Sequence, residues 1–399
     1  MMRVSLTSSI QHAAALAPAP APLPLLNPVG ARIVLGDHLA ADGLPAPLLP
    51  SRATLFGPRG VAFASRQGPF FIADTGHHRL LVWRTVPNTD NSPADLLIGQ
   101  PDFNVEGRNA GGNVGPATLN MPSGIATDGR VLAVADAWNH RILIWCSLPE
   151  VNNQPADIVL GQADFSGGLA NRGSSNAGPH TLNWCYGVTI ADGRLFVADT
   201  GNRRVLIWNT LPGENGQPAD MVLGQAGMTI HDDNAGAEAS AVGMRWPHAI
   251  VVANGRIFVA DAGNSRIMVW NGFPNADGAP ASFVIGQAGF EAVDHNRAAY
   301  EPSAHALQMP YGITVHDDML VCADTGNSRL VGFPLPGLAM DAAATTLTGQ
   351  RRFSDKGDNR WRFAARDSLC WPFAVTVCDG LVAVADTGNN RVLLWEAAV

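Results

Sequence analysis

The chain of 399 residues is poor in charge, and this scarcity excludes several classes of protein. Charged residues make up 15% of the sequence, Lys356 is its only lysine, and the formal net charge is −8. Because nucleic acids and anionic membranes are bound through clusters of cations, we expect neither as a partner of the chain as a whole. Nor is any apolar run long enough to span a bilayer.

The sequence also lacks the short motifs that identify common active sites. It contains no G-x-S-x-G turn, no P-loop and no G-x-G-x-x-G after a predicted strand. Its five cysteines are odd in number and form no C-x-x-C pair, which argues against a disulfide framework or a structural zinc site. We therefore expect buried, reduced thiols, no cofactor, and a cytoplasmic protein.

What the chain does contain is a repeat. The twelve residues VADTGNRRVLIW, which end at Trp208, recur in six variants across the sequence. Their aspartates follow one another every 62 or 63 residues, at Asp74, Asp136, Asp199, Asp261, Asp324 and Asp386. Each period holds four short segments rich in β-branched residues, separated by Gly, Asn and Asp turns, and this pattern is typical of a propeller blade. The predicted fold is all-β, a six-bladed β-propeller.

The two ends of the sequence predict how the ring of blades closes. The last blade, residues 372–396, lacks a fourth strand, and the missing sequence occurs near the N-terminus as ARIVLGD, residues 31–37. We predict that this strand completes the sixth blade, because a closed ring leaves no open sheet edge. Alternating Ala and Pro predict an extended tail over residues 1–30, ahead of a propeller over 31–399. Deleting residues 1–28 should then matter little, and deleting 1–37 should destabilise the protein.

Each repeat carries an aspartate and an arginine five residues apart, as in Asp199 and Arg204. The Thr-Gly-Asn turn between them would bring the two side chains together between the second and third strands of a blade. Because one ring rarely contains six identical active centres, we interpret each pair as a structural ion pair.

These motifs resemble the NHL-repeat family of β-propellers. The resemblance rests on ADTGNxRVLIW with PxG before it and VLGQ after it, and it covers residues 31–399. The chain is similar in particular to bacterial members whose blades carry LGQPDF and LNxPxG, here IGQPDFN from Ile98 and LNMPSG from Leu119. The resemblance implies a six-bladed propeller. It leaves the function open, since the family includes interaction scaffolds, RNA binders and a few enzymes.

The candidate site follows from the start of each innermost strand, at the PxG motif, where residues should ring the central channel. The position before the glycine varies while its surroundings repeat, as in a recognition ring; its members are Arg59, Ser123, Tyr186, His248, Tyr311 and Phe373. Two residues earlier lies a largely aromatic set: Gly57, Met121, Trp184, Trp246, Met309 and Trp371. We predict a ligand-binding mouth made of the ring and the three tryptophans. The alternative is that the tryptophans and methionines only plug the channel.

Long insertions at every blade boundary should emerge together on one face, where such loops serve either function or packing. We favour a monomeric, non-catalytic scaffold that holds a protein segment or a small ligand at this face and at the mouth. One insertion contains RRFSDKGDNRWRF from Arg351, which we interpret as a solvated loop and not as a nucleic-acid site.

The alternative function is a lyase or hydrolase working in the channel. Peptidyl-hydroxyglycine lyases, which the chain resembles weakly, hold a metal with histidines in PH motifs, and WPHAI supplies one here at His248. His248 would then act as the base or as a metal ligand, Arg59 would bind an anionic group, and Tyr186 or Tyr311 would act as the acid. A catalytic zinc needs about three protein ligands. The ring offers one imidazole, so we expect no metal unless His180 and His305 reach the mouth.

Overall fold

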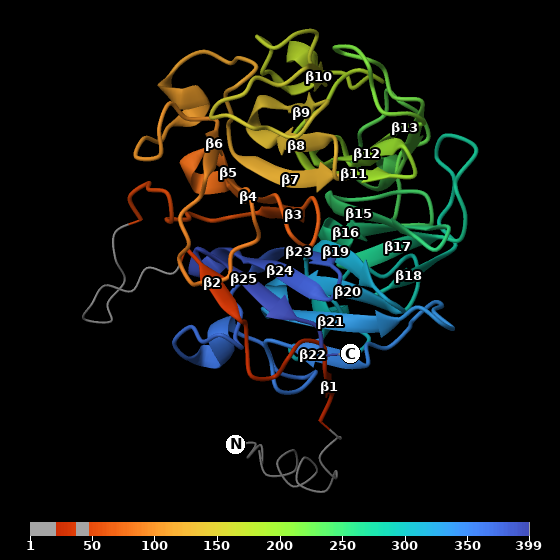
Figure 1. Ribbon diagram of the computed structural model, residues 1–399. Helices are drawn as coiled ribbons and strands as arrows, with labels where there is room; N and C mark the ends of the chain where they lie inside the picture. Colours follow the sequence, from red (N-terminus) through yellow and green to blue (C-terminus); the bar gives the residue numbers. More distant parts are fainter. Residues whose placement is uncertain (1–20, 37–47, 399) are drawn as a thin grey trace, which may run out of the picture.

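The structure, a computed structural model, describes residues 21–36 and 48–398. Six sheets, antiparallel except for one short N-terminal strand, follow one another around a central channel, each with its innermost strand nearest the axis (Figure 1). The described residues contain no α-helix, and their only helical segments are short 3-10 turns. The predicted all-β, six-bladed β-propeller is confirmed.

Each blade contains strands of four kinds, from the axis outward. The innermost strands are β3 (Gly60–Phe63), β7 (Pro122–Thr127), β11 (Cys185–Ala191), β15 (Pro247–Ala253), β19 (Pro310–His316) and β23 (Pro372–Cys378). The second strands are β4 (Phe70–Asp74), β8 (Leu132–Asp136), β12 (Arg194–Asp199), β16 (Arg256–Asp261), β20 (Met319–Asp324) and β24 (Leu381–Asp386). The third strands are β5 (Arg79–Trp83), β9 (Arg141–Trp145), β13 (Arg204–Trp208), β17 (Arg266–Trp270), β21 (Arg329–Pro334) and β25 (Arg391–Glu396). The outer strands are β6 (Leu96–Ile98), β10 (Ile158–Leu160), β14 (Met221–Leu223), β18 (Phe283–Ile285), β22 (Thr346–Thr348) and, from the N-terminus, β2 (Ile33–Leu35).

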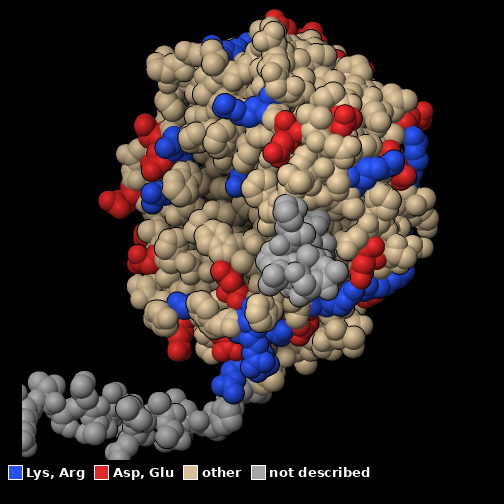
Figure 2. Space-filling view, turned by 90° about the vertical axis from the view of Figure 1, so that its left-hand side faces the viewer, with Lys and Arg blue, Asp and Glu red and all other residues tan. Residues whose placement is uncertain are grey.

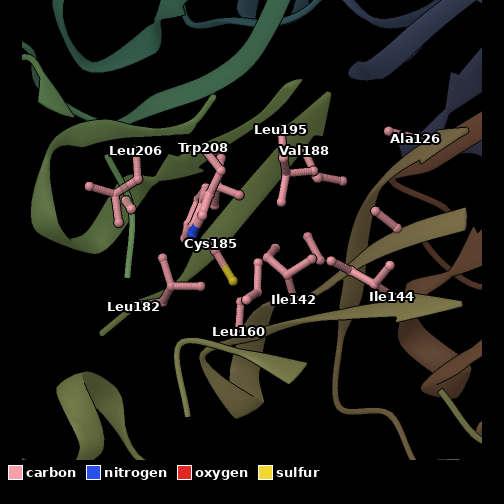
Figure 3. Packing of buried hydrophobic residues seen from close by; sticks show 14 of the residues in the cluster. Ala126, Ile142, Ile144, Leu160, Leu182, Cys185, Val188, Leu195, Leu206 and Trp208 are labelled. Carbon is pink, nitrogen blue, oxygen red and sulfur yellow. The ribbon is translucent and has the colours of Figure 1, made fainter. Parts of the chain in front are cut away.

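Apolar side chains fill the space between neighbouring blades. The six buried clusters each draw on two adjacent blades, as a ring of sheets requires. Figure 3 shows the cluster between blades two and three, where Ile142 and Leu160 of one blade face Cys185 and Trp208 of the next. The blades are therefore held by the packing of one sheet face on another.

The repeated aspartate and arginine form a buried ion pair in every blade, as predicted. In blade three, Arg204 Nε donates to Asp199 Oδ2 at 2.7 Å, and both side chains are fully buried. The other Oδ of Asp199 accepts the backbone N–H of Asn183 at 2.7 Å, at the entry to the innermost strand. The remaining pairs are Asp74–Arg79, Asp136–Arg141, Asp261–Arg266, Asp324–Arg329 and Asp386–Arg391.

The long insertions between blades are attached at both ends. After β10, Gln162 Nε2 donates at 3.0 Å to the carbonyl of His140, in the turn between β8 and β9 of the same blade. Further along the same insertion, Asn171 and Asn202 exchange two amide hydrogen bonds of 3.0 and 2.9 Å, and Asn202 also donates to Asp199. Similar asparagine contacts recur in four further blades, as Asn109–Asn139, Asn234–Asn264, Asn296–Asn327 and Asn359–Asn389. The bases of these loops therefore serve packing.

The N-terminal strand closes the ring. Strand β2 pairs antiparallel with β25, so that Ile33 lies opposite Leu394 and Leu35 opposite Val392. The sixth blade thereby gains the fourth strand that its own sequence lacks, as predicted.

The predicted boundary at residue 30 is too late, however. Strand β1 (Leu23–Pro24) pairs parallel with β22 at the outer edge of blade five, and Leu25 and Leu26 are 3% and 2% exposed. Asn27 completes the attachment, since its carbonyl accepts the indole N–H of Trp395 at 2.8 Å. Leu25 and Leu26 directly follow the alternating Ala and Pro residues, so the sequence pattern did not indicate that they are buried. Residues 1–20 of the predicted tail, and Asp37 of the predicted strand, lie outside the described residues.

The cysteines differ in part from expectation. All five are free thiols, and Cys185 and Cys322 are buried as expected. Cys146 is exposed, and Cys370 and Cys378 are intermediate, because they lie at strand ends and in turns. Within the described ranges, no helix is long and apolar enough to cross a membrane.

Candidate functional site

A β-bulge aims the ring residues of five blades into the channel, and among the described strands only those of blade one, with Arg59, lack it. In blade three the register of β11 and β12 shifts between Cys185 and Gly187, so Tyr186 is the extra residue, and four other blades shift at the same place. Gly187 permits this arrangement, because a Cβ there would stand 2.0 Å from the carbonyl oxygen of His248. All six predicted ring residues line one cavity of about 220 Å³ that continues between the innermost strands.

Four of the ring residues stack into a continuous arc. The rings of Tyr186 and His248 are parallel at 5.1 Å between centroids, and those of His248 and Tyr311 are parallel at 4.2 Å. Tyr311 then contacts Phe373 at 4.5 Å, and the guanidinium of Arg59 lies 5.0 Å from the centre of the Phe373 ring. Such stacked and cation–π contacts hold the side chains in fixed positions.

His248 occupies the middle of this arc as a neutral imidazole. It is 8% exposed, and its Nδ1 lies 2.9 Å from the carbonyl oxygen of Trp246, so Nδ1 carries the proton. Burial lowers the pKa of His248 to about 4, and the positive charge of Arg59 acts in the same direction.

Three tryptophans form a rim above the ring. Trp184, Trp246 and Trp371 are 49%, 42% and 47% exposed, and with every ring residue except Ser123 they line a mouth cavity of about 440 Å³. All three have a left-handed backbone, with φ of 45°, 57° and 50°. This conformation is unfavourable for bulky residues and persists only where surrounding contacts impose it. In two blades, a histidine of the preceding blade accepts a hydrogen bond from the backbone at this position. His140 Nδ1 accepts the N–H of Trp184 at 3.0 Å, and His78 Nδ1 accepts the N–H of Met121 at 3.0 Å.

The three tryptophans of the predicted tryptophan and methionine plug stand at the entrance to the channel. The three tryptophans are about half exposed and stand at the rim, whereas the constriction below them is the arc of Tyr186, His248, Tyr311 and Phe373. The arc residues belong to the linings of both the mouth cavity and the channel cavity, so the arc separates the two.

Sequence reasoning missed part of the mouth. Asn183, Thr200, Arg203 and Thr387 also line it, from the turns after the second strands and the segments before the first. A signal was present at the residue that follows the repeated turn, which is left-handed in every blade and differs from blade to blade: His78, His140, Arg203, Ser265, Ser328 and Asn390. Like the ring position, this position varies between blades while the residues around it repeat, which indicates that it belongs to the site.

The histidines proposed to join His248 lie elsewhere. His180 is exposed on its insertion, and His305 contacts Asp341, with its Nδ1 2.9 Å from the Asp341 carbonyl oxygen. Neither residue lines the mouth or the channel. Across residues 21–36 and 48–398, no three His, Cys, Asp or Glu side chains gather as a metal site would require.

The basic and aromatic segment from Arg351 forms a separate surface feature. It borders a groove of about 330 Å³ in which the Lys356 ammonium lies 3.6 Å from the centre of the Tyr300 ring. Trp361 and Phe363 are 78% and 98% exposed. Elsewhere, basic and acidic side chains are interspersed over the face drawn in Figure 2, without a broad field of one sign.

The neutral His248 predicts a pH dependence of stability. Its pKa of about 4 in the folded chain lies below the value of 6.5 in the unfolded chain, so the unfolded state binds the extra proton between these pH values. The free energy of unfolding should be fully retained above pH 6.5 and should lose about 3 kcal/mol as the pH falls to 4. Urea unfolding at several pH values measures this. The variant His248→Phe should remove that part of the slope, and an unchanged slope would contradict a neutral, buried His248.

Together, the four-stranded blades, the channel and the closing N-terminal strand define a six-bladed β-propeller with an aromatic mouth. The family model "NHL repeat" matches residues 119–145 and 244–270. NHL repeat-containing protein 2 of Gallus gallus is 28% identical over 393 residues, which cover 91% of this chain and 48% of that protein. The Homo sapiens protein of the same name is 27% identical over 247 residues, or 58% of this chain and 31% of that protein. The chain therefore spans about half or less of the length of these relatives.

Among solved structures, Kuenenia stuttgartiensis hydrazine synthase superposes with a TM-score of 0.50 at 12% identity, covering 87% of this chain and 97% of that one. At this identity the likeness concerns the fold alone. The family model thus finds two NHL repeats within the six blades observed, so the chain is a six-bladed β-propeller that contains NHL repeats. The narrower resemblance to bacterial members stays a prediction.

Proposed function

We propose that the chain is a binding scaffold whose mouth holds an extended protein segment. The observation that carries this proposal is the rim of Trp184, Trp246 and Trp371, which are about half exposed above a concave cavity. Tryptophan is among the residue types that contribute most to binding at protein interfaces. Large apolar side chains held exposed by an unfavourable backbone are expected where they contact a partner.

The dimensions of the mouth favour a segment over a broad surface contact. The cavity of about 440 Å³ is large enough for one or two side chains of a partner, or for a small ligand. The stacked arc at its base would stop such a group from passing into the channel. The proposal keeps the chain monomeric and places it in the cytoplasm, where the exposed Cys146 thiol would stay reduced.

The alternative of a channel lyase or hydrolase has less support. Its base or metal ligand, His248, is stacked between two tyrosines, and the two histidines that were to assist it lie outside the mouth. We therefore propose no reaction.

A randomised pool of synthetic octapeptides tests the scaffold proposal. Immobilised protein should retain a subset of the pool, and mass spectrometry identifies the retained sequences. Replacing the three rim tryptophans with alanine should reduce retention at least tenfold, because each removes an apolar anchor from a concave site. The matched control is Trp361→Ala, an exposed tryptophan outside the mouth, which should retain peptides as the parent does. Equal retention by the triple variant would overturn the proposal.

A further inference from the structure

Arg59 is a partly buried cation without a counter-ion. Its guanidinium forms no hydrogen bond or ion pair with any residue in the described part of the chain, and its one specific contact is the face of Phe373. The mouth lining contains a second arginine, Arg203, but no carboxylate. Arg203 differs because it is already paired with Asp233 at 2.6 Å. Removing a charge from water without a partner is unfavourable, so Arg59 is the group in the mouth that lacks an anion.

Ser123 lies beside Arg59 and leaves the ring open on that side. It is the smallest ring residue, and a Cβ added at Gly60, next to Arg59, would stand 1.9 Å from the Ser123 carbonyl oxygen. The arc of stacked rings runs from Tyr186 to Phe373 and ends at Arg59, so it does not fill the position of Ser123. Ser123 is 1% exposed, and its Oγ has no hydrogen-bond partner among the described residues. A buried hydroxyl without a partner is unusual, because buried polar groups are nearly always hydrogen-bonded.

We propose that Arg59 and Ser123 form a subsite that binds a carboxylate where the mouth meets the channel cavity, because Arg59 lines both cavities and Ser123 lines the channel cavity. The guanidinium would donate to the carboxylate oxygens, and the Ser123 hydroxyl would donate one further hydrogen bond. Each of the two groups then gains the partner that it lacks. The inference rests on the proposed function, since it takes the mouth as the binding site, and it adds the chemistry of the group that is bound.

The chemistry of the ring favours a carboxylate over other charged groups. An aromatic cage can bind a cation, but here Arg59 already supplies the positive charge and no acidic residue lines the cavity to offset a second one. A phosphate dianion needs more donors than one guanidinium and one hydroxyl. A planar carboxylate presents two oxygens, which one guanidinium can bind at once. The stacked rings beside it suit an apolar or aromatic group attached to that carboxylate.

Isothermal titration with 3-phenylpropionate and its uncharged amide, 3-phenylpropionamide, tests the subsite. The acid should bind at least tenfold more tightly than the amide, from the usual strength of a hydrogen bond to a charged group. Arg59→Gln should weaken the acid at least tenfold, and Ser123→Ala should weaken it about threefold to tenfold. Arg130→Gln is the matched control, since Arg130 is exposed on the turn at the far end of β7. Melting temperatures of all variants check that each is folded.

Octapeptide pools with free and with amidated C-termini distinguish the two sources of a carboxylate. Stronger retention of the free pool assigns the subsite to a peptide C-terminus. Binding of 3-phenylpropionate that depends on Arg59, with neither pool retained, assigns it to a small organic acid and overturns the segment proposal alone. Retention of both pools alike, lost with the rim tryptophans but not with Arg59→Gln, keeps the scaffold and overturns the subsite. Failure of every carboxylate probe to bind also overturns the subsite.

Discussion

Replacing Asp199 with asparagine should lower the free energy of unfolding by about 3–5 kcal/mol, the usual effect of removing one member of a buried ion pair. The Asp199 carboxylate accepts hydrogen bonds from Arg204, from Asn202 and from the backbone of Asn183, and it is fully buried. The substitution removes the negative charge and leaves the guanidinium of Arg204 uncompensated at 0% exposure. Unfolding in urea measures the effect.

A neighbouring ion pair provides the matched control. Asp233 pairs with Arg203, the residue before Arg204, at 2.6 Å, but the two side chains are 46% and 31% exposed. Because surface ion pairs contribute little, Asp233→Asn should change the free energy of unfolding by no more than about 1 kcal/mol. Similar losses in the two variants would show that burial does not give the repeated pair its importance.

The architecture could be predicted from the sequence because each blade repeats the same short motif and the same local structure. An aspartate, a turn and an arginine recur six times, and the same buried geometry results each time. The missing outer strand of the last blade identified its replacement at the N-terminus, and β2 occupies that place. The motif occurs six times at a nearly constant spacing, so a chance resemblance to a propeller blade could be excluded.

The contacts made once, or between distant loops, could not be predicted. Leu25 and Leu26 follow a run of alternating Ala and Pro, and nothing local indicates that they pack on blades five and six. The pairing of Asn171 with Asn202 joins residues 31 positions apart, and both asparagines read as ordinary turn residues. Their function in packing depends on tertiary structure that sequence patterns do not encode.

The candidate site was predicted as a set of positions but not as an arrangement. Variation at the position before the PxG glycine identified all six ring residues, which line one cavity. The stacking of Tyr186, His248 and Tyr311 depends on side-chain directions set by the bulges, and the unpaired state of Arg59 depends on which side chains of other blades reach it. For the same reason, the sequence could not decide between an open mouth and a tryptophan plug.

Shortening the N-terminus in steps should have the largest effect of all, because it removes both attachments that close the ring. The reference is a chain that begins at residue 21 and retains every described residue. A chain that begins at residue 29 loses Leu25 and Leu26, which are 3% and 2% exposed, and each buried leucine contributes about 1.5–3 kcal/mol. It should unfold at clearly lower urea concentration, contrary to the expectation from the sequence alone. A chain that begins at residue 37 also loses β2 and should not fold.

A permuted chain separates loss of closure from general damage to the terminus. Residues 21–36 would follow residue 398 through a flexible linker, in a protein that begins at residue 48. Because β2 pairs with β25, which is near the C-terminus, the moved segment can reach the same edge of blade six. Circular dichroism and urea unfolding should show a folded protein close in stability to the reference. If the chain that begins at residue 37 were equally stable without the moved segment, β2 would not be needed to close the ring, and the exposed edge of β25 would have to be tolerated.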